Sequence, residues 1–576
     1  MFNNNSSFIN PYNFVSLGRK KVERSKFIDQ EKDENLTGYI DITLDVRNSL
    51  IIPGQYLADK NEYDYYKYPN SDKPVIPGSQ IRGVIRNVYE TITDSCLSNI
   101  NKSDSNISQR IQAGNFYKDC FIMMYDNGWI LIPAHKYIYK KDVTIDENNV
   151  AYINGEKFED FDLVSAKTFS KKNQKLCDNI THDYDGECIL HISHKNDSSK
   201  HRVSIFRENY NSQYDIPLSE KDIQRFVELL DIYKEFAENA KKTNDEDNHY
   251  TEDYENYRRA IKDKQPVPVF ANVESRNKIY ISPAQIGRKL SYKNLKDCYT
   301  GYETCSSKEH CCPACSMFGF IKNKENLTGK LKFMDLTLTD DSKFLKVGAK
   351  EFISLEPKIS NLNFYANPES NDWDDSNIRI RGRKFYWHID RPTTPIESEN
   401  KNIYSHYHVI TKTSFDKLQF KGRVYFRDIK EKELKYLIFA LCLSNDNTHM
   451  HKIGHAKPYG YGSVKIKCTD LYFRKINLEN DSFGIESIKQ NLNDYLLTWD
   501  QLSNEYISKK SIDELKAMTD VNTVSGRNVV YPYINQEDKQ EGHFWFADYP
   551  NTKLPSVSSD SSTLILSAKA QKKDKK

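Results

Sequence analysis

Five of the eleven cysteines gather between Cys298 and Cys315, and this cluster is the strongest indication of metal chemistry in the chain. Cys312 and Cys315 form a Cys-x2-Cys knuckle, whose tight turn can place two thiolates on one tetrahedral ion. Cys305 and either His310 or Cys298 could complete the site, so the sequence leaves the ligand set open. A zinc ion with four protein ligands has no open position, so the site would be structural. The alternative is a group of buried or redox-active thiols without metal.

A glycine-rich loop, GHAKPYGYG, spans residues 454–462 and could bind phosphate. Glycines let backbone N–H groups approach an anion closely, and the lysine in the loop adds charge. A plain turn is the alternative, but the loop stands between an expected helix and an expected strand. The candidate RNA contacts in this loop are Gly454, Lys457, Gly460, Tyr461 and Gly462.

A helix is predicted to begin near Ser79, which follows a Pro-Gly turn and could act as its N-cap. Free N–H groups at a helix N-terminus attract phosphate. Gln80 lies in the same first turn, and Arg82 and Arg86 lie one turn apart, where they could straddle an RNA backbone. The alternative is an ordinary capped amphipathic helix whose arginines are solvated.

Positive charge is dense along an expected strand over residues 378–388. Arg379, Arg381 and Arg383 alternate, which would place them on one face of a sheet. Without acidic partners on the neighbouring strands, such a row of arginines indicates a site that binds a polyanion such as RNA. Tyr386 and Trp387 could stack on bases or belong to the core.

Composition narrows the class of protein. The 576-residue chain has 83 basic and 81 acidic residues, a net charge of +2, so RNA binding would depend on local patches. The chain contains no run of 18 apolar residues and opens on Asn and Ser rather than an apolar signal, so we expect a cytoplasmic protein without a membrane span. An odd, clustered set of cysteines argues against a secreted disulfide framework.

Two strand–helix units are expected to share one sheet. Residues 37–46 alternate like a half-buried strand and precede the helix near residue 79, while a strand over 420–426, a helix over 431–443 and a strand over 463–473 follow later. This order predicts an α+β, ferredoxin-like (RRM-like) core with an antiparallel sheet. A further strand is expected over 327–336, and helices over 220–241, 484–498 and 511–519.

The expected organisation interrupts this core with a large, polar insertion. The segments are an N-terminal arm over 1–35, a core over 36–96 and 296–473 with its zinc-binding segment at 298–319, an insertion over 97–295, a helical C-terminal extension over 474–565, and a disordered lysine-rich tail over 566–576.

Three motifs in one order resemble the RAMP superfamily of CRISPR-associated proteins. They are IPGSQIRG at 76–83, CPACSMFG at 312–319 and GHAKPYGYG at 454–462. The set is similar to the "Cas seven" backbone subunits of type III and related effectors. Blocks at 10–15, 329–335 and 532–535 resemble a long, insertion-bearing branch of that group.

The resemblance implies a subunit that coats a CRISPR guide RNA, lies beside further copies of itself and presents the guide to a complementary target RNA. It implies backbone contacts by the motif residues at the helix start and in the glycine-rich loop, and it supports a zinc site. Other effector subunits would be partners, among them a separate nuclease.

An enzyme is the alternative that the resemblance leaves open. Target-cleaving members place an aspartate between the first strand and the first helix, where this chain has Asp59 and Asp64. Such a carboxylate would bind Mg²⁺ or orient a ribose 2′-hydroxyl. An endonuclease that processes guide precursors would instead use a histidine, for which His388 and His455 are the candidates.

Overall fold

The computed structural model divides the chain into two compact units, residues 1–105 with 295–576 and residues 106–294. The second unit corresponds to the insertion that the sequence predicts over 97–295, but it begins at Asn106 and ends at Asn294. The structure describes residues 7–18, 21–25, 35–98, 100, 105–110, 117–141, 143–146, 150–171, 174–183, 186–192, 203–209, 215–242, 251–285, 287–322, 325–353, 361–393, 404–412, 416–444, 446–479, 482–502, 507–531, 545, 549 and 551–567. Within these ranges, the helices lack the combination of length and apolar composition that a membrane span requires.

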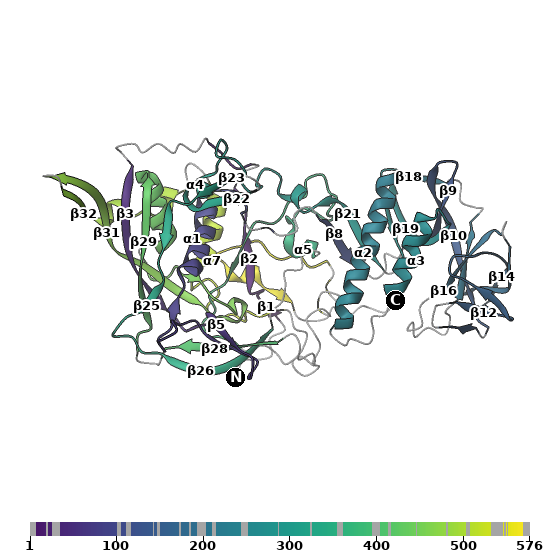
Figure 1. Ribbon diagram of the computed structural model, residues 1–576, viewed down its shortest axis with the longest axis horizontal. Helices are drawn as coiled ribbons and strands as arrows, with labels where there is room; N and C mark the ends of the chain where they lie inside the picture. The colour runs from purple at the N-terminus through teal and green to yellow at the C-terminus, as the bar shows by residue number, and fades with distance from the viewer. Residues whose placement is uncertain are drawn as a thin grey trace. The chain divides into compact units, whose positions relative to one another are not determined.

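An eight-stranded antiparallel sheet forms the centre of the first unit. Figure 1 shows its strands β31, β3 and β29 side by side. The strands in spatial order are β30 (His451–Lys452), β31 (Ser463–Glu479), β3 (Leu36–Val46), β29 (Gln419–Ile429), β25 (Leu336–Leu338) and β7 (Val75–Ile76), with β32 (Ser482–Gln490) on β31 and β24 (Leu331–Phe333) on β29.

Two helices cover the apolar side of this sheet because each has an apolar face at helical spacing. Helix α1 (Gly78–Ile92) buries Ile81, Ile85 and Val88, and it contacts α6 (Glu431–Cys442). Strand β3 alternates as the sequence predicts, with every second side chain buried. The Glu433 carboxylate accepts a hydrogen bond from the Lys430 N–H at 2.9 Å, which satisfies one free donor at the start of α6.

A second sheet lies beside the glycine-rich loop. Its strands in order are β26 (Leu345–Ile353), β28 (Tyr404–Thr411), β6 (Glu62–Tyr65) and β5 (Pro53–Leu57), with β4 (Ser49–Leu50) on β28. Phe352 and Tyr407 from this sheet form a buried cluster with Tyr459 and Tyr461 of the loop. The loop is therefore attached to the protein by its aromatic side chains.

The expected N-terminal arm is partly wrong, because residues 7–15 belong to the core. Strand β1 (Ser7–Phe8) pairs with β33 (Leu566–Ser567), and β2 (Tyr12–Val15) pairs with β27 (Arg383–Tyr386). The apolar side chains of β1 and β2 are buried against aromatic residues from near the C-terminus, which holds this segment in place. The expected disordered tail is corrected at residues 566–567, while residues 568–576 lie outside the described residues.

Three expected elements differ in the structure. The strand over 327–336 is divided among β23 (Glu325–Thr328), β24 and β25, and the strand over 378–388 shortens to β27. The helix over 484–498 is wrong, because β32 pairs along the extended β31 and a short 3₁₀ turn, Leu492–Tyr495, follows it. Pairing with a distant strand overrides local helical preference. The helix over 511–519 is present as α7 (Lys509–Thr519).

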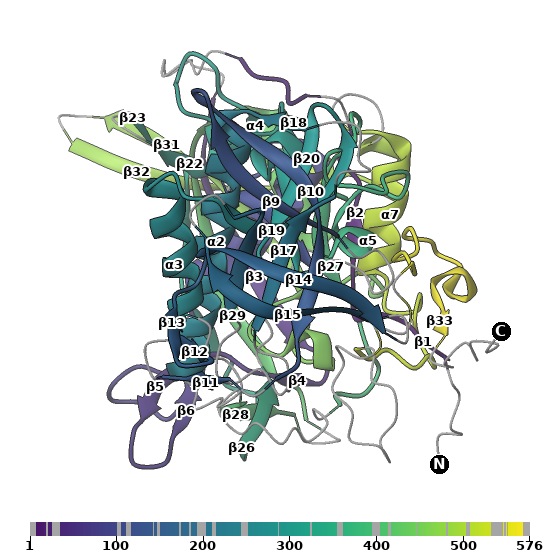
Figure 2. The same ribbon diagram turned by 90° about the vertical axis from the view of Figure 1, so that its right-hand side faces the viewer.

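The second unit is built on a nine-stranded sheet. Figure 2 shows its central strands with α2 (Glu220–Lys242) and α3 (Thr251–Lys262), which contact β20 and β19 respectively. The main path is β15 (Gln174–His182), β14 (Leu163–Lys171), β16 (Cys188–Ile192), β17 (Val203–Glu208), β10 (Gly128–Tyr139), β9 (Lys118–Tyr125), β19 (Val267–Ser275) and β20 (Lys278–Ser282), with β18 (Ile216–Leu218) on β10.

Smaller strand groups complete the unit. Strands β8 (Asn106–Arg110) and β21 (Arg288–Asn294) pair with each other, as do β11 (Thr144–Ile145), β12 (Ala151–Ile153) and β13 (Glu156–Phe158).

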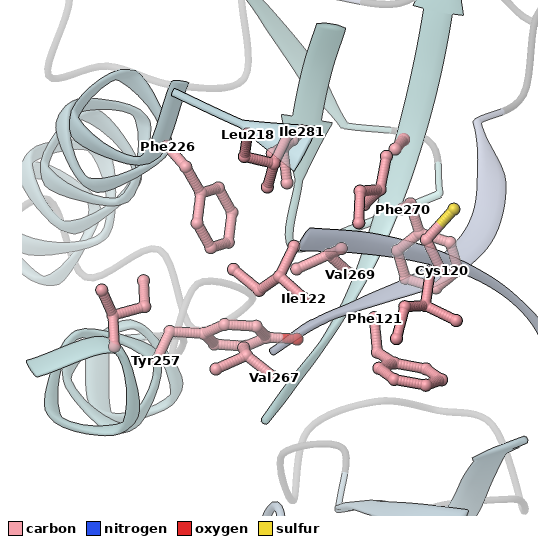
Figure 3. Close-up of a cluster of buried hydrophobic side chains, with 14 of the residues drawn as sticks. Cys120, Phe121, Ile122, Leu218, Phe226, Tyr257, Val267, Val269, Phe270 and Ile281 are labelled. Carbon is pink, nitrogen blue, oxygen red and sulfur yellow. The ribbon is translucent and has the colours of Figure 1, made fainter. Parts of the chain in front are cut away.

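The core of the second unit lies between its helices and its sheet. Phe226 from α2 and Tyr257 from α3 point toward Ile122 and Val267 of the sheet (Figure 3). The Phe226 and Tyr257 rings meet edge-on, with 6.0 Å between their centroids. This unit therefore has a hydrophobic core of its own.

We predict that Phe226→Ala lowers the free energy of unfolding of the second unit by about 3–5 kcal/mol, because the ring leaves a cavity between helix and sheet. Tyr125→Ala is the matched control, since Tyr125 is 63% exposed and its loss should change stability little. Hydrogen exchange at the backbone amides of β9 and β19 in increasing urea measures both variants, because four of the five tryptophans lie in the first unit and fluorescence would mostly report that unit. Equal stability of the two variants would contradict the role of this core.

Candidate functional site

Four buried sulfur atoms converge in the first unit, those of Cys96, Cys305, Cys312 and Cys315, and all lie within 4.8 Å of one another. The Sγ atom of Cys96 is 3.5 Å from that of Cys315 and 3.6 Å from that of Cys312. A tetrahedral zinc ion with bonds of about 2.3 Å places its sulfur ligands roughly 3.8 Å apart. The four thiols therefore fit a structural zinc ion.

The backbone around the knuckle favours thiolates. Cys312 is the N-cap of α4 (Pro313–Phe318), and its sulfur accepts a hydrogen bond from the Cys315 N–H at 3.4 Å. The Cys312 N–H donates to the Cys305 sulfur at 3.3 Å. Hydrogen bonds from Cys311 and from the other cluster thiols hold the pKa of Cys305 well below its usual range.

The structure brings together only part of the expected ligand set. Cys305, Cys312 and Cys315 belong to the cluster, whereas Cys298 and His310 do not. Cys298 is buried in the turn Lys296–Tyr299, where its carbonyl accepts a hydrogen bond from the Ile380 N–H, and His310 is exposed. Sequence reasoning missed Cys96, which lies just beyond the end of α1. The one available signal was a cysteine directly after an amphipathic helix.

Arg86 links this cluster to a buried carboxylate. Its guanidinium donates to Glu90 at 2.8 Å, to the Gly319 carbonyl at 3.2 Å and to the Cys315 sulfur at 3.7 Å. Burial alone would lower the pKa of Arg86, but Glu90 and the nearby sulfurs raise it, so the group stays charged. Its positive charge opposes the excess negative charge that four thiolates around one zinc ion would carry.

Two of the arginines expected to face RNA are instead buried. The Arg381 guanidinium donates to the carbonyls of Asn363 and Leu554, and that of Arg383 donates to the carbonyls of Ser95 and Cys96. Arg383 also pairs with Glu90 at 3.4 Å. Both residues are buried and their guanidinium groups are bonded to backbone carbonyls, so neither lies on an open sheet face. Arg379 is partly buried beside Asn367.

The start of α1 differs from the expected N-cap arrangement. Pro77 is the N-cap residue, and the Gly78 N–H donates to the Asp335 carboxylate at 2.8 Å. Arg82 donates to the Phe318 carbonyl at 2.6 Å. Ser79 is exposed and Gln80 is partly exposed. Among the residues expected at this helix start, these two are the ones left at the surface without a described side-chain partner.

The glycines of the loop are required by close packing. Gly454 and Gly462 have positive φ angles of 73° and 76°, and a Cβ atom would lie 2.2 Å from the Ile51 carbonyl oxygen and 1.9 Å from that of Ile453. Gly460 is also in the left-handed region, with φ of 92°. Tyr461 is 2% exposed and meets the Phe352 ring, so its side chain belongs to the core. Lys457 remains partly exposed.

The two candidate histidines occupy different environments. His388 is 1% exposed, and its Nδ1 lies 3.0 Å from the Ser463 hydroxyl. Burial, with help from nearby cations, holds its pKa well below the usual value, so the ring is neutral. It is not placed to reach an external substrate. His455 is exposed, and its pKa is lowered by partial burial and by Lys457.

Asp64 lies among cations rather than among metal ligands. Its carboxylate is 3.1 Å from the Lys346 ammonium, 3.5 Å from that of Lys67 and 3.5 Å from His408 Nδ1. Burial alone would raise the pKa of Asp64, but hydrogen bonds from Lys346 and from the Tyr65 N–H, together with the charges of Lys346 and Lys67, lower it.

The surroundings of Asp64 do not fit Mg²⁺, which prefers several oxygen ligands. The carboxylate of Glu62, on the same strand β6, pairs with His408 Nε2 at 2.9 Å. Asp59 is exposed in a turn. Neither aspartate gains a catalytic partner from the described residues.

The comparisons with known proteins identify one family. A family model described as the RAMP superfamily matches residues 67–465, which contain α1, the cysteine cluster and the glycine-rich loop. No curated protein matches the chain.

We predict that Cys96→Ser removes bound zinc and lowers the melting temperature, because it leaves three sulfur ligands for an ion that needs four. Cys298→Ser is the control, since it changes a cysteine that is equally buried but lies outside the cluster. Zinc content of the purified proteins by mass spectrometry distinguishes the two. Zinc retained in the first variant and lost in the second would instead make Cys298, one of the candidates from the sequence, a ligand in place of Cys96.

Proposed function

The chain belongs to the RAMP superfamily, and on this premise we propose that it is a guide-RNA-binding backbone subunit of a multisubunit CRISPR effector that targets RNA. The family association already indicates a CRISPR-associated, RNA-binding protein. The finer role proposed is that several copies lie side by side along one guide RNA and present it to a complementary target RNA.

The order of elements supports a ferredoxin-like, RRM-like core for this subunit. The chain passes through β3, α1, β25, β29, α6 and β31, and the sheet order is β31, β3, β29, β25. Ferredoxin-like folds contain two strand–helix–strand repeats, and the strands of the two repeats alternate in one antiparallel sheet. Folds of this kind bind RNA at loops and sheet faces in several families.

One observation carries the proposal: an uncompensated positive charge at the glycine-rich loop. Lys457 forms no ion pair among the described residues, although partial burial lowers the pKa of its ammonium group. Arg86 and Arg383 near the cysteine cluster differ from Lys457, because both pair with Glu90. A charge kept at the surface of the core without an acidic partner among the described residues is the kind of group that binds an RNA phosphate.

Cleavage is assigned to another subunit in this proposal. The carboxylate of Asp64 is held by Lys346, Lys67 and His408, and the neutral His388 is buried. We therefore expect partners of three kinds: guide RNA with its target, further copies of this chain, and effector subunits that include a nuclease.

The test is to express the chain beside its own repeat array and to sequence the RNA that copurifies. We predict enrichment of repeat-derived guides. Ser79→Glu should lower RNA yield several-fold, because an added charge about 4 Å from a phosphate costs about 1 kcal/mol in water. Ser559→Glu is the matched control, since Ser559 is also an exposed serine.

RNA without repeat sequences would contradict the guide-binding role. Equal RNA yield from the two serine variants would exclude the start of α1 as an RNA contact. The sequence of the RNA that copurifies with the wild-type chain would still decide whether the protein binds guide RNA.

A further inference from the structure

Four cationic side chains gather beneath and beside the glycine-rich loop. Lys457 is in the loop, Lys384 is on β27, Lys452 is on β30, and Arg47 follows β3. The ammonium nitrogens of Lys384 and Lys457 lie 5.3 and 6.0 Å from the centroid of the same Tyr386 ring. The Lys452 ammonium donates to the carbonyl of Tyr461 in the loop at 3.1 Å. Distant parts of the sequence therefore bring positive charge to one place.

The described residues supply little negative charge to this cluster. Asp390 pairs with Arg47 at 3.0 Å, and none of the three lysines forms an ion pair within the described ranges. The second guanidinium nitrogen of Arg47, Nη1, is buried without a hydrogen-bond partner. The other titratable groups that face the cluster are neutral or weakly acidic: His388, His451, His455, Tyr12, Tyr365 and Tyr386.

Aromatic packing explains only part of this arrangement. The Lys384 ammonium lies 3.7 Å from the centroid of the Tyr12 ring, a cation–π contact that fixes its direction. Such a contact does not remove the repulsion among neighbouring cations. Burial and Lys457 lower the pKa of Lys384 to about 8, and burial with Arg47 and Lys457 lowers that of Lys452 to about 7. Charged groups in this setting are unfavourable unless an anion joins them.

We propose that Lys384, Lys452 and Lys457 form a phosphate site for the RNA backbone, with Arg47 behind it. The inference rests on the proposed function and adds two lysines from outside the loop to the contact surface. The phosphate would lie beside Lys457, whose charge acts on both Lys384 and Lys452, and it would supply the negative charge that the described residues lack. The loop then serves as one wall of the site rather than as the whole of it.

Proton uptake is the distinguishing property of such a site. A bound phosphate favours the ammonium form of each lysine, so it raises a pKa that is depressed in the free protein. Binding therefore takes up protons, and affinity falls as the pH rises through about 7 to about 8, where Lys452 and Lys384 lose their charge in the free protein. Ordinary surface lysines, with pKa values of about 10.4, would give no such change.

The first experiment measures binding of a labelled single-stranded RNA to the full chain by fluorescence anisotropy at several salt concentrations. Lys384→Met with Lys457→Met should weaken binding roughly tenfold. The plot of log affinity against log salt should become less steep by about 0.7 for each phosphate that is no longer neutralised by a lysine. Lys489→Met is the matched control, because Lys489 is exposed and pairs with Asp470. Unchanged affinity and slope in the double variant would overturn the proposal.

The second experiment repeats the titration between about pH 6.5 and about pH 8.5, the range in which the depressed lysines change charge. Lys384→Arg with Lys452→Arg keeps both positive charges at every pH, so it should bind at the upper end as well as at the lower end. Wild-type affinity should decline across the range. A wild-type profile as flat as that of the arginine variant would also overturn the proposal.

Failure of the site and failure of the proposed function give different results. Wild-type chain that binds RNA, together with a double methionine variant that binds equally, overturns the site alone. If the wild type binds no RNA, inorganic phosphate becomes the probe in a thermal-shift assay. Stabilisation of the wild type but not of the double variant then supports an anion site without the RNA function. Stabilisation of neither overturns both.

Discussion

The four cysteine sulfurs are the constraint on which the first unit depends. Cys96 follows α1 directly, whereas the other three lie beyond the entire second unit in sequence. Their convergence fixes the end of α1, and α1 in turn packs against α6. Arg383 also stabilises the end of α1, because its guanidinium donates to the Cys96 carbonyl. The Glu90 carboxylate on α1 accepts from both Arg86 and Arg383. The four-cysteine cluster thus joins two parts of the core that are distant in sequence.

Positive charge is used in two different ways in this unit. Around the cysteines, Arg86 and Arg383 are buried with carbonyl, carboxylate and sulfur partners, so they contribute to the fold. Around the glycine-rich loop, the ammonium groups of Lys384 and Lys457 meet aromatic rings instead of carboxylates. A buried cation whose hydrogen-bond and ion-pair partners are all present is not stabilised further by a ligand. A cation without a carboxylate partner is stabilised when an anion binds beside it. Near neutral net charge therefore does not exclude a local anion site.

Sequence reasoning succeeded where structure depends on neighbours along the chain. Alternation predicted β3, and helical spacing predicted α1 and α6. The knuckle at Cys312 and Cys315 was also readable, because its geometry is local. Cys96 was missed because its partners are distant in sequence. The alternation of Arg381 and Arg383 could not reveal that their guanidinium groups are buried on the carbonyls of Leu554 and Ser95, and the pairing of β32 with β31 overrode an expected helix. Tertiary contacts decided each of these cases.

The ends of the second unit lie next to each other. Asn106 and Asn294 are paired across β8 and β21, and in the first unit the Leu295 N–H donates to the Ser105 carbonyl at 3.3 Å. The chain therefore leaves the first unit and returns to it at a single point, as a side branch does. Joining neighbouring ends requires little loop entropy, so a short turn could close the gap. Such a branch can be enlarged, exchanged or removed during evolution while the register of the central sheet stays the same.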